Sequence, residues 1–205
     1  MTELFISAFI TFFVVIDPPG CAPIYASLTG SAPARERRIM AIRAVFVATV
    51  ILLVFALFGE GLLGALGISL DSFRIAGGIM LFLIALEMVF EKRTERREVR
   101  ADEIRGKPEY EDVSIFPMAM PMIAGPGSIA AVMLLTAQND GVDNALVILG
   151  ALGSVLALTL LALLAAGRLM RLLGNKVEAV ITRVLGVLLG ALAVQFVVDG
   201  LNASF

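Results

Sequence analysis

Two short motifs interrupt long apolar stretches of this sequence and could bind a charged solute. They are residues 17–21 (DPPGC) and residues 125–128 (GPGS). Proline lacks a backbone N–H and its ring clashes with the preceding helical turn, so each motif should break a helix. Where a helix restarts, its first N–H groups have no partner within the helix, and they carry about half a positive charge. We therefore expect half-helix ends after Gly20 and after Gly127 that together could hold a carboxylate.

Asp17 is the charged residue of the first motif and is expected at the end of the first half-helix. A carboxylate near the middle of a bilayer is costly and is by default functional, so Asp17 could meet a substrate ammonium group or carry a proton. An Asp before proline could equally cap the half-helix that follows. Residues of both motifs make up the candidate substrate site: Asp17, Pro18, Gly20, Cys21, Gly125, Gly127 and Ser128.

Two further polar residues in apolar stretches, together with Asp17, are candidates for a proton or pathway role. Glu60 is expected near the outer end of a membrane span, where it could instead reach only the interface. Gln195 falls in the last apolar stretch, where it could serve the pathway or form a hydrogen bond across helices. The chain has no His and one Cys. Because it lacks the usual metal ligands and general bases, we expect neither an enzyme nor a cofactor, metal or nucleic-acid partner.

The elements that must position these residues are membrane helices. The chain is 59% hydrophobic with a mean hydropathy of +0.95, and residues 113–139 contain no charge. A hydrocarbon core about 30 Å thick needs roughly 20 apolar residues per helix. We predict an all-α membrane protein whose first and fourth helices are broken near the midplane. Its six transmembrane helices are expected at residues 4–29, 42–65, 72–91, 114–137, 144–167 and 179–200.

Basic residues are confined almost entirely to three connections between the predicted helices. The connections after helices one, three and five hold four, seven and four of the 16 Lys and Arg residues, which leaves Arg74 alone. By the positive-inside rule these connections lie in the cytoplasm. The sequence therefore predicts a multi-pass protein of the cell inner (plasma) membrane with both termini outside the cytoplasm.

The two halves of the chain repeat. Residues 16–29 can be laid on residues 123–136 with an offset of 107, which aligns Pro19 with Pro126. Each half holds three helices, so the second half would enter the membrane upside down relative to the first, as in inverted-repeat transporters. We expect a first three-helix repeat at residues 1–91, a cytoplasmic linker at residues 92–112 and a second, inverted repeat at residues 113–205.

Several motifs follow one another in a distinctive order and spacing: residues 17–24 (DPPGCAPI), 58–60 (FGE), 73–78 (FRIAGG), 117–121 (PMAMP), 124–127 (AGPG) and 193–200 (AVQFVVDG). In these motifs, and over nearly its whole length, the chain resembles the MarC family of bacterial and archaeal inner-membrane proteins. Cys21 is a departure, because family members commonly carry Asn after the first Gly. A thiol is a weak donor whereas an amide both donates and accepts, so substrate choice could differ at this position.

The resemblance implies a six-span carrier whose substrates are small neutral amino acids such as alanine and glycine. The expected partners are that amino acid, the lipid bilayer, a proton or cation as coupling ion, and a second copy in a homo-oligomer. Two alternatives stay open: an exporter of other small solutes or drugs, and a channel for ions or small solutes built on re-entrant geometry. A carrier accounts for both the inverted repeat and the paired breaks.

Overall fold

A computed structural model describes residues 1–90, 112–139 and 141–204, apart from the side chains of residues 169–179. Across these residues the structure is helical and contains no strand, which confirms the predicted all-α class. The elements in chain order are α1 (Thr2–Ile16), α2 (Pro18–Leu28), α3 (Ala34–Ala65), α4 (Leu70–Val89), η1 (Ser114–Ile123), α6 (Pro126–Gln138) and α7 (Val142–Ser204).

Five segments are long and apolar enough to cross a membrane: Thr2–Leu28, Ala34–Ala65, Leu70–Val89, Val142–Arg168 and Val180–Ser204. The pair formed by η1 and α6, bent by 52°, makes a sixth if it is counted as one span. α3 begins at Ala34 rather than near residue 42 as predicted. Its first turns are rich in Ala, Arg and Glu, which are good helix formers, so the helix continues through a charged region that hydropathy excludes.

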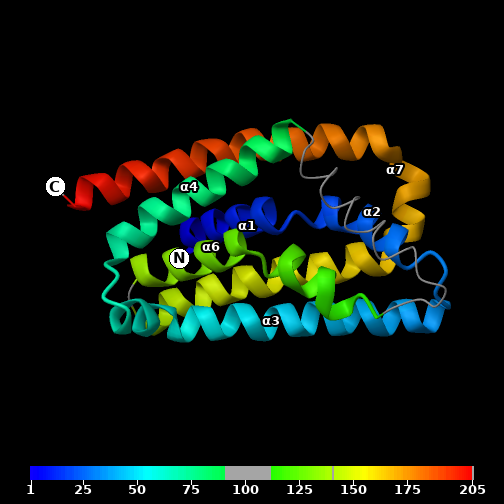
Figure 1. The fold of residues 1–205 in the computed structure, drawn as a ribbon, viewed down its shortest axis with the longest axis horizontal. Coiled ribbons are helices and arrows are strands. Elements are labelled where there is room, and N and C mark those ends of the chain that lie inside the picture. The colour runs from blue at the N-terminus through cyan, green and yellow to red at the C-terminus, as the bar shows by residue number, and fades with distance from the viewer. Residues whose placement is uncertain (91–111, 140, 205) are drawn as a thin grey trace.

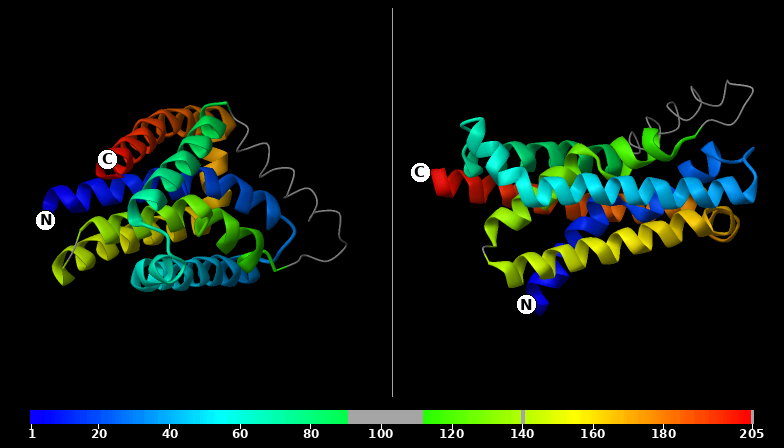
Figure 2. Two further views of the ribbon diagram at one scale, coloured as in Figure 1. Left: turned by 60° about the vertical axis from the view of Figure 1, so that its left-hand side comes forward. Right: turned by 90° about the horizontal axis from the view of Figure 1, so that it is seen from below.

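The helices lie side by side along the long axis of the molecule, with both termini at one end (Figure 1). The start of α3 lies at the opposite end, where α7 turns between Arg168 and Val180 and runs back. Figure 2 shows the same helical bundle in two further views. The arginines in the first turns of α3 and Arg168 therefore share one end of the bundle.

α4 and the second half of α7 pack through glycines. A Cβ placed on Gly78 would lie 2.8 Å from the carbonyl oxygen of Ala193. A Cβ placed on Gly186 would lie 2.8 Å from the Cβ of Met88. Real Cβ atoms do not approach other atoms so closely, so these positions must lack a side chain for the two helices to meet.

Many large apolar side chains on the outer surface remain exposed. Phe46 and Phe58 are each 66% exposed, and Leu57 is 65% exposed. Apolar surface on this scale marks contact with another apolar medium, and lipid is the medium that suits helices of this length.

Candidate substrate site at the two helix breaks

The first break is one residue wide and lies at Asp17. This residue has φ 58° and ψ 64°, in the left-handed region that Asp tolerates better than most residues, and it ends α1 while starting α2. Its N–H donates to the carbonyl oxygen of Phe13, and its Oδ1 accepts a hydrogen bond of 3.1 Å from the N–H of Gly20. The predicted capping role of Asp17 is therefore present in the structure.

Gly20 and Cys21 both contribute to the geometry of this turn. A Cβ added to Gly20 would lie 2.2 Å from Asp17 Oδ2, so any larger residue would have to displace the carboxylate. The Cys21 thiol donates to the carbonyl oxygen of Ile16 over 3.4 Å and so spans the break. The glycine and the cysteine thus hold the local geometry of the break.

The second break is wider and less regular than predicted. Phe116 and Met120 have extended backbone angles inside η1, each directly before a proline. The residue before proline is pushed out of the α region, which explains why no regular half-helix forms here. After Ile123 the chain turns by 52°, and α6 starts at Pro126 with Gly125 as its N-cap.

Both half-helices restart earlier than predicted, at Pro18 and Pro126 rather than after Gly20 and Gly127. Proline is favoured at the first helical position, where its missing N–H is no loss, so the helices begin with their prolines. Pro126 follows Pro18 by 108 residues, one more than the offset of 107 read from the sequence. In this register Gly20, not Cys21, occupies the position that corresponds to Ser128.

The two breaks lie next to each other because α6 packs against α1 and α4. A Cβ placed on Gly127 would lie 3.3 Å from Val15 Cγ1, 3.2 Å from Leu81 Cδ2 and 2.7 Å from Ile84 Cδ1. Val15 is two residues before Asp17, so the start of α6 meets the last turn of α1. The side of Gly127 that a side chain would occupy is filled by the protein itself.

All seven predicted substrate-site residues are buried in this conformation. Asp17 is 1% exposed, Cys21 is 0% exposed and Ser128 is 2% exposed. The structure thus buries both motifs, and the contact between Gly127 and Val15 places them near each other. Their contact with a substrate remains a prediction.

The other two predicted pathway residues lie apart from this group. Glu60 is exposed near the end of α3. Gln195 is also exposed, and its Nε2 donates to Asp199 Oδ1 over 2.7 Å. This bond lies within α7 rather than across helices, which was one of the two roles considered for Gln195, because residues four apart are neighbours on a helix surface. Within the described ranges, no group of three or more His, Cys, Asp or Glu side chains could hold a metal ion.

An ion pair anchors the start of η1. Asp112 pairs with Arg43 of α3, and Asp112 Oδ1 accepts a hydrogen bond of 2.9 Å from the N–H of Ser114. Partial burial of Asp112 opposes its ionisation. The hydrogen bonds from Ser114 and the charge of Arg43 outweigh that effect and hold the pKa of the Asp112 carboxyl below its usual value.

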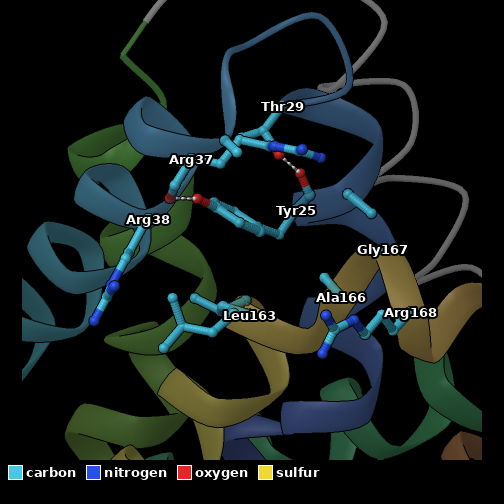
Figure 3. Close-up of a pocket in the computed structure, with 11 residues that line it drawn as sticks. Tyr25, Thr29, Arg37, Arg38, Leu163, Ala166, Gly167 and Arg168 are labelled. Carbon is cyan, nitrogen blue, oxygen red and sulfur yellow. Dashed lines mark hydrogen bonds between the residues drawn. The ribbon is translucent and has the colours of Figure 1, made fainter.

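Sequence reasoning missed a cavity of about 480 Å³ at the basic end of the bundle. α2, α3 and α7 enclose it, and its polar lining residues include Tyr25, Thr29, Arg37, Arg38 and Arg168 (Figure 3). The sequence assigned these arginines to topology alone. In the sequence these arginines appear only as part of the positive charge of the predicted cytoplasmic connections. The cavity itself arises from the packing of three separate helices, which the sequence does not show.

The fold and the two breaks define a class: an all-helical, multi-pass membrane protein with interruptions in two of its membrane segments. The chain belongs to the MarC family. Residues 2–205 match the family described as "MarC family integral membrane protein". The family resemblance predicted from the motifs is thereby confirmed.

Relatives in archaea and bacteria align over almost their full lengths. The UPF0056 membrane protein MJ1677 of Methanocaldococcus jannaschii is 41% identical over 203 residues, covering 98% of this chain and 98% of that protein. The UPF0056 membrane protein YvbG of Bacillus subtilis is 33% identical over 205 residues, covering 100% of this chain and 97% of that protein. A UPF0056 membrane protein of Aquifex aeolicus is 36% identical over 201 residues, covering 97% and 92%. No solved structure matches this chain.

Proposed function

We propose that this chain is a secondary transporter of small neutral amino acids such as alanine and glycine. The observation that carries the proposal is that α6, which starts at Pro126, packs against the last turn of α1, just before the break at Asp17, with both breaks inside segments of membrane length. Interrupted membrane helices place unsatisfied backbone groups beside a solute, and paired interruptions in the two halves of a chain are typical of transporter binding sites.

The start of α6 is the better candidate for the substrate carboxylate. Its first intrahelical hydrogen bond runs from the N–H of Ile129 to the carbonyl oxygen of Gly125. The N–H groups of Gly127 and Ser128 therefore have no partner within the helix, and the positive end of the helix dipole favours an anion there. The Ser128 hydroxyl is a further donor.

The first break is better suited to the substrate ammonium group. The N–H of Gly20 is already bonded to Asp17, which removes one of the donors that a carboxylate would need. A carboxylate has about four lone-pair sites, so Asp17 can accept more than one hydrogen bond and its charge suits an ammonium group. An amino acid would then lie with its carboxylate toward Ser128 and its ammonium group toward Asp17. A proton on Asp17 is the simplest candidate for the coupling ion.

Burial of the seven site residues favours a carrier over a channel. A channel needs a continuous path, whereas a carrier hides its site from at least one side at all times. A closed site of this kind requires a conformational change to load and release the substrate. An exporter of other small solutes would use the same machinery, and Cys21 in place of the family's common Asn is the feature that would alter its selectivity.

Counterflow in proteoliposomes tests this proposal. Vesicles containing the purified full chain are loaded with unlabelled alanine and diluted into a trace of labelled alanine. A carrier should accumulate label transiently, and uptake should saturate with external alanine. Label that only equilibrates, without overshoot or saturation, would indicate a channel. No flux beyond that of protein-free vesicles would reject alanine as a substrate.

A further inference from the structure

The cavity at the basic end of the bundle is distinct from the two helix breaks, since none of the seven predicted site residues lines it. Its volume is about 480 Å³, which is large enough for a small organic group. Tyr25 and Thr29 contribute from α2, Arg37 and Arg38 from α3, and Arg168 from α7. Residues of α2, α3 and α7 therefore line the cavity together.

Positive charge dominates the polar lining. Arg37, Arg38 and Arg168 contribute three guanidinium groups, and none of the described residues that line the cavity carries a carboxylate. Among residues whose placement is described, none of these arginines forms an ion pair with an acidic side chain. A concave site lined by charges of one sign concentrates the field and attracts an ion of opposite charge.

The three guanidinium groups surround the cavity and do not meet within it. In Figure 3 the Arg37 side chain passes above the Tyr25 ring toward Thr29, while the Arg168 guanidinium lies on the other side of the ring, near Ala166. Arg38 extends away along the neighbouring edge. An anion placed between them could receive hydrogen bonds from more than one direction.

Hydrogen bonds fix the polar wall in place. The Tyr25 hydroxyl donates to the carbonyl oxygen of Arg37, and the Thr29 hydroxyl donates to the carbonyl oxygen of Tyr25 over 2.7 Å. Because both hydroxyl protons are used, the free donors toward a ligand are the guanidinium groups. The α7 wall adds the apolar side chains of Leu163 and Leu164 beside Arg168, so the cavity combines cationic and apolar lining.

We propose that this cavity binds a phosphate-bearing anion. Every cation in its lining is arginine, whose planar fork matches the oxygens of a phosphate and whose charge persists at all relevant pH values. Basic pockets between membrane helices at the cytoplasmic side bind anionic lipid head groups. The same donors would accept a soluble phosphate ester, so the two sources share one chemistry. The proposal does not depend on the transport activity proposed above.

Two substitutions and one matched control test it. Arg38→Gln and Arg168→Gln each remove a guanidinium from an exposed side chain at the cavity. Arg35→Gln is the control, because Arg35 is also exposed, near Arg38 on α3, but does not line the cavity. Each variant has the same change in net charge, so a difference between them reports position rather than bulk electrostatics.

The full chain in neutral detergent is titrated with phosphatidylglycerol, phosphatidylcholine or inorganic phosphate, and bound ligand is counted by native mass spectrometry. We expect phosphatidylglycerol to bind more tightly than phosphatidylcholine. Arg38→Gln and Arg168→Gln should each weaken it about tenfold, the loss of one charge-assisted hydrogen bond. Arg35→Gln should bind as the parent does.

Competition with inorganic phosphate distinguishes a lipid head group from a soluble phosphate compound as the ligand. Displacement of the lipid by millimolar inorganic phosphate would assign the site to a soluble phosphate compound, and retention of the lipid would assign it to a head group. Equal binding of phosphatidylglycerol and phosphatidylcholine by the parent, with no bound phosphate, would overturn the proposal. Equal weakening by all three variants would overturn it as well. The comparison of ligands in the parent remains decisive even if a variant fails to fold.

Discussion

Asp17 Oδ1 accepts a hydrogen bond from the backbone N–H of Gly20, 3.1 Å away, and this bond fixes the turn that interrupts the first membrane segment. The carboxylate that caps α2 is also a buried acidic group, two residues after Val15, which lies against Gly127 at the start of α6. Capping and the proposed substrate binding would therefore use the same side chain, and variants must be chosen to separate them.

Asp17→Asn separates the two roles. The amide oxygen can still accept from the N–H of Gly20, so the variant should remain folded and inserted while alanine counterflow falls sharply. Asp17→Ala is the control for capping, and its loss of the cap should lower the free energy of unfolding by about 1 kcal/mol. Counterflow and thermal unfolding are measured on both variants. Parental transport by Asp17→Asn would leave Asp17 with the capping role alone.

Gly127 can be tested against its packing partner. Gly127→Ala places a Cβ 2.7 Å from Ile84 Cδ1, and such overpacking should lower stability by about 1–3 kcal/mol. Ile84→Val removes that Cδ1 atom, so the double variant Gly127→Ala/Ile84→Val should regain most of the lost stability. Thermal unfolding checks this. Failure of the double variant to recover would mean that Leu81 or Val15 sets the limit instead.

Ionisation of Asp112 should make the stability of the fold depend on pH under acidic conditions. Its pKa is lowered in the folded state, so its contribution is present above the unfolded value of about 3.9 and is lost as pH falls through the folded value. Arg43 and Asp112 are 50% and 46% exposed, so the pair should contribute no more than about 1 kcal/mol. Asp112→Asn should slightly lower the melting temperature at pH 7 and flatten its decline between about pH 5 and pH 3. Parallel pH profiles for parent and variant would exclude this role.

Accessibility of introduced cysteines tests the predicted orientation. A cysteine at Ala34 should react with an impermeant reagent only from the cytoplasm, and cysteines at Ser69 or Ser204 only from outside. All three positions are exposed, whereas the native Cys21 is buried and should add little background. Labelling from the opposite side at any of them would contradict the topology drawn from the basic residues.

The breaks could be placed from the sequence because proline acts locally. Asp17 was expected at the end of the first half-helix, and the structure puts it there. The exact restarts were wrong by three and two residues, since the preference of Pro18 and Pro126 for the first helical position was not weighed. The irregular course of η1 follows from the prolines that come after Phe116 and Met120, a restriction that hydropathy does not register.

Contacts between distant segments could not be predicted in this way. Gln195 bonds to Asp199 within its own helix, and one sequence does not say which polar neighbour a side chain will choose. The cavity between Tyr25, Arg38 and Arg168 depends on how α2, α3 and α7 pack, and nothing in the order of residues encodes that packing locally. Its arginines are part of the charge bias that predicts topology. Because the positive-inside rule already explained them, their sequence positions gave no reason to expect a ligand-binding role.

The most direct test of the central claim compares ligands in the unmodified protein. If the N–H groups at the start of α6 hold a carboxylate and Asp17 meets an ammonium group, both ends of an amino acid are needed for tight binding. Alanine should therefore compete with labelled alanine in counterflow far better than ethylamine, which lacks the carboxylate, or propionate, which lacks the ammonium group. No substitution is involved, so folding does not complicate the result. Equal competition by alanine and ethylamine would contradict a carboxylate site at the helix breaks.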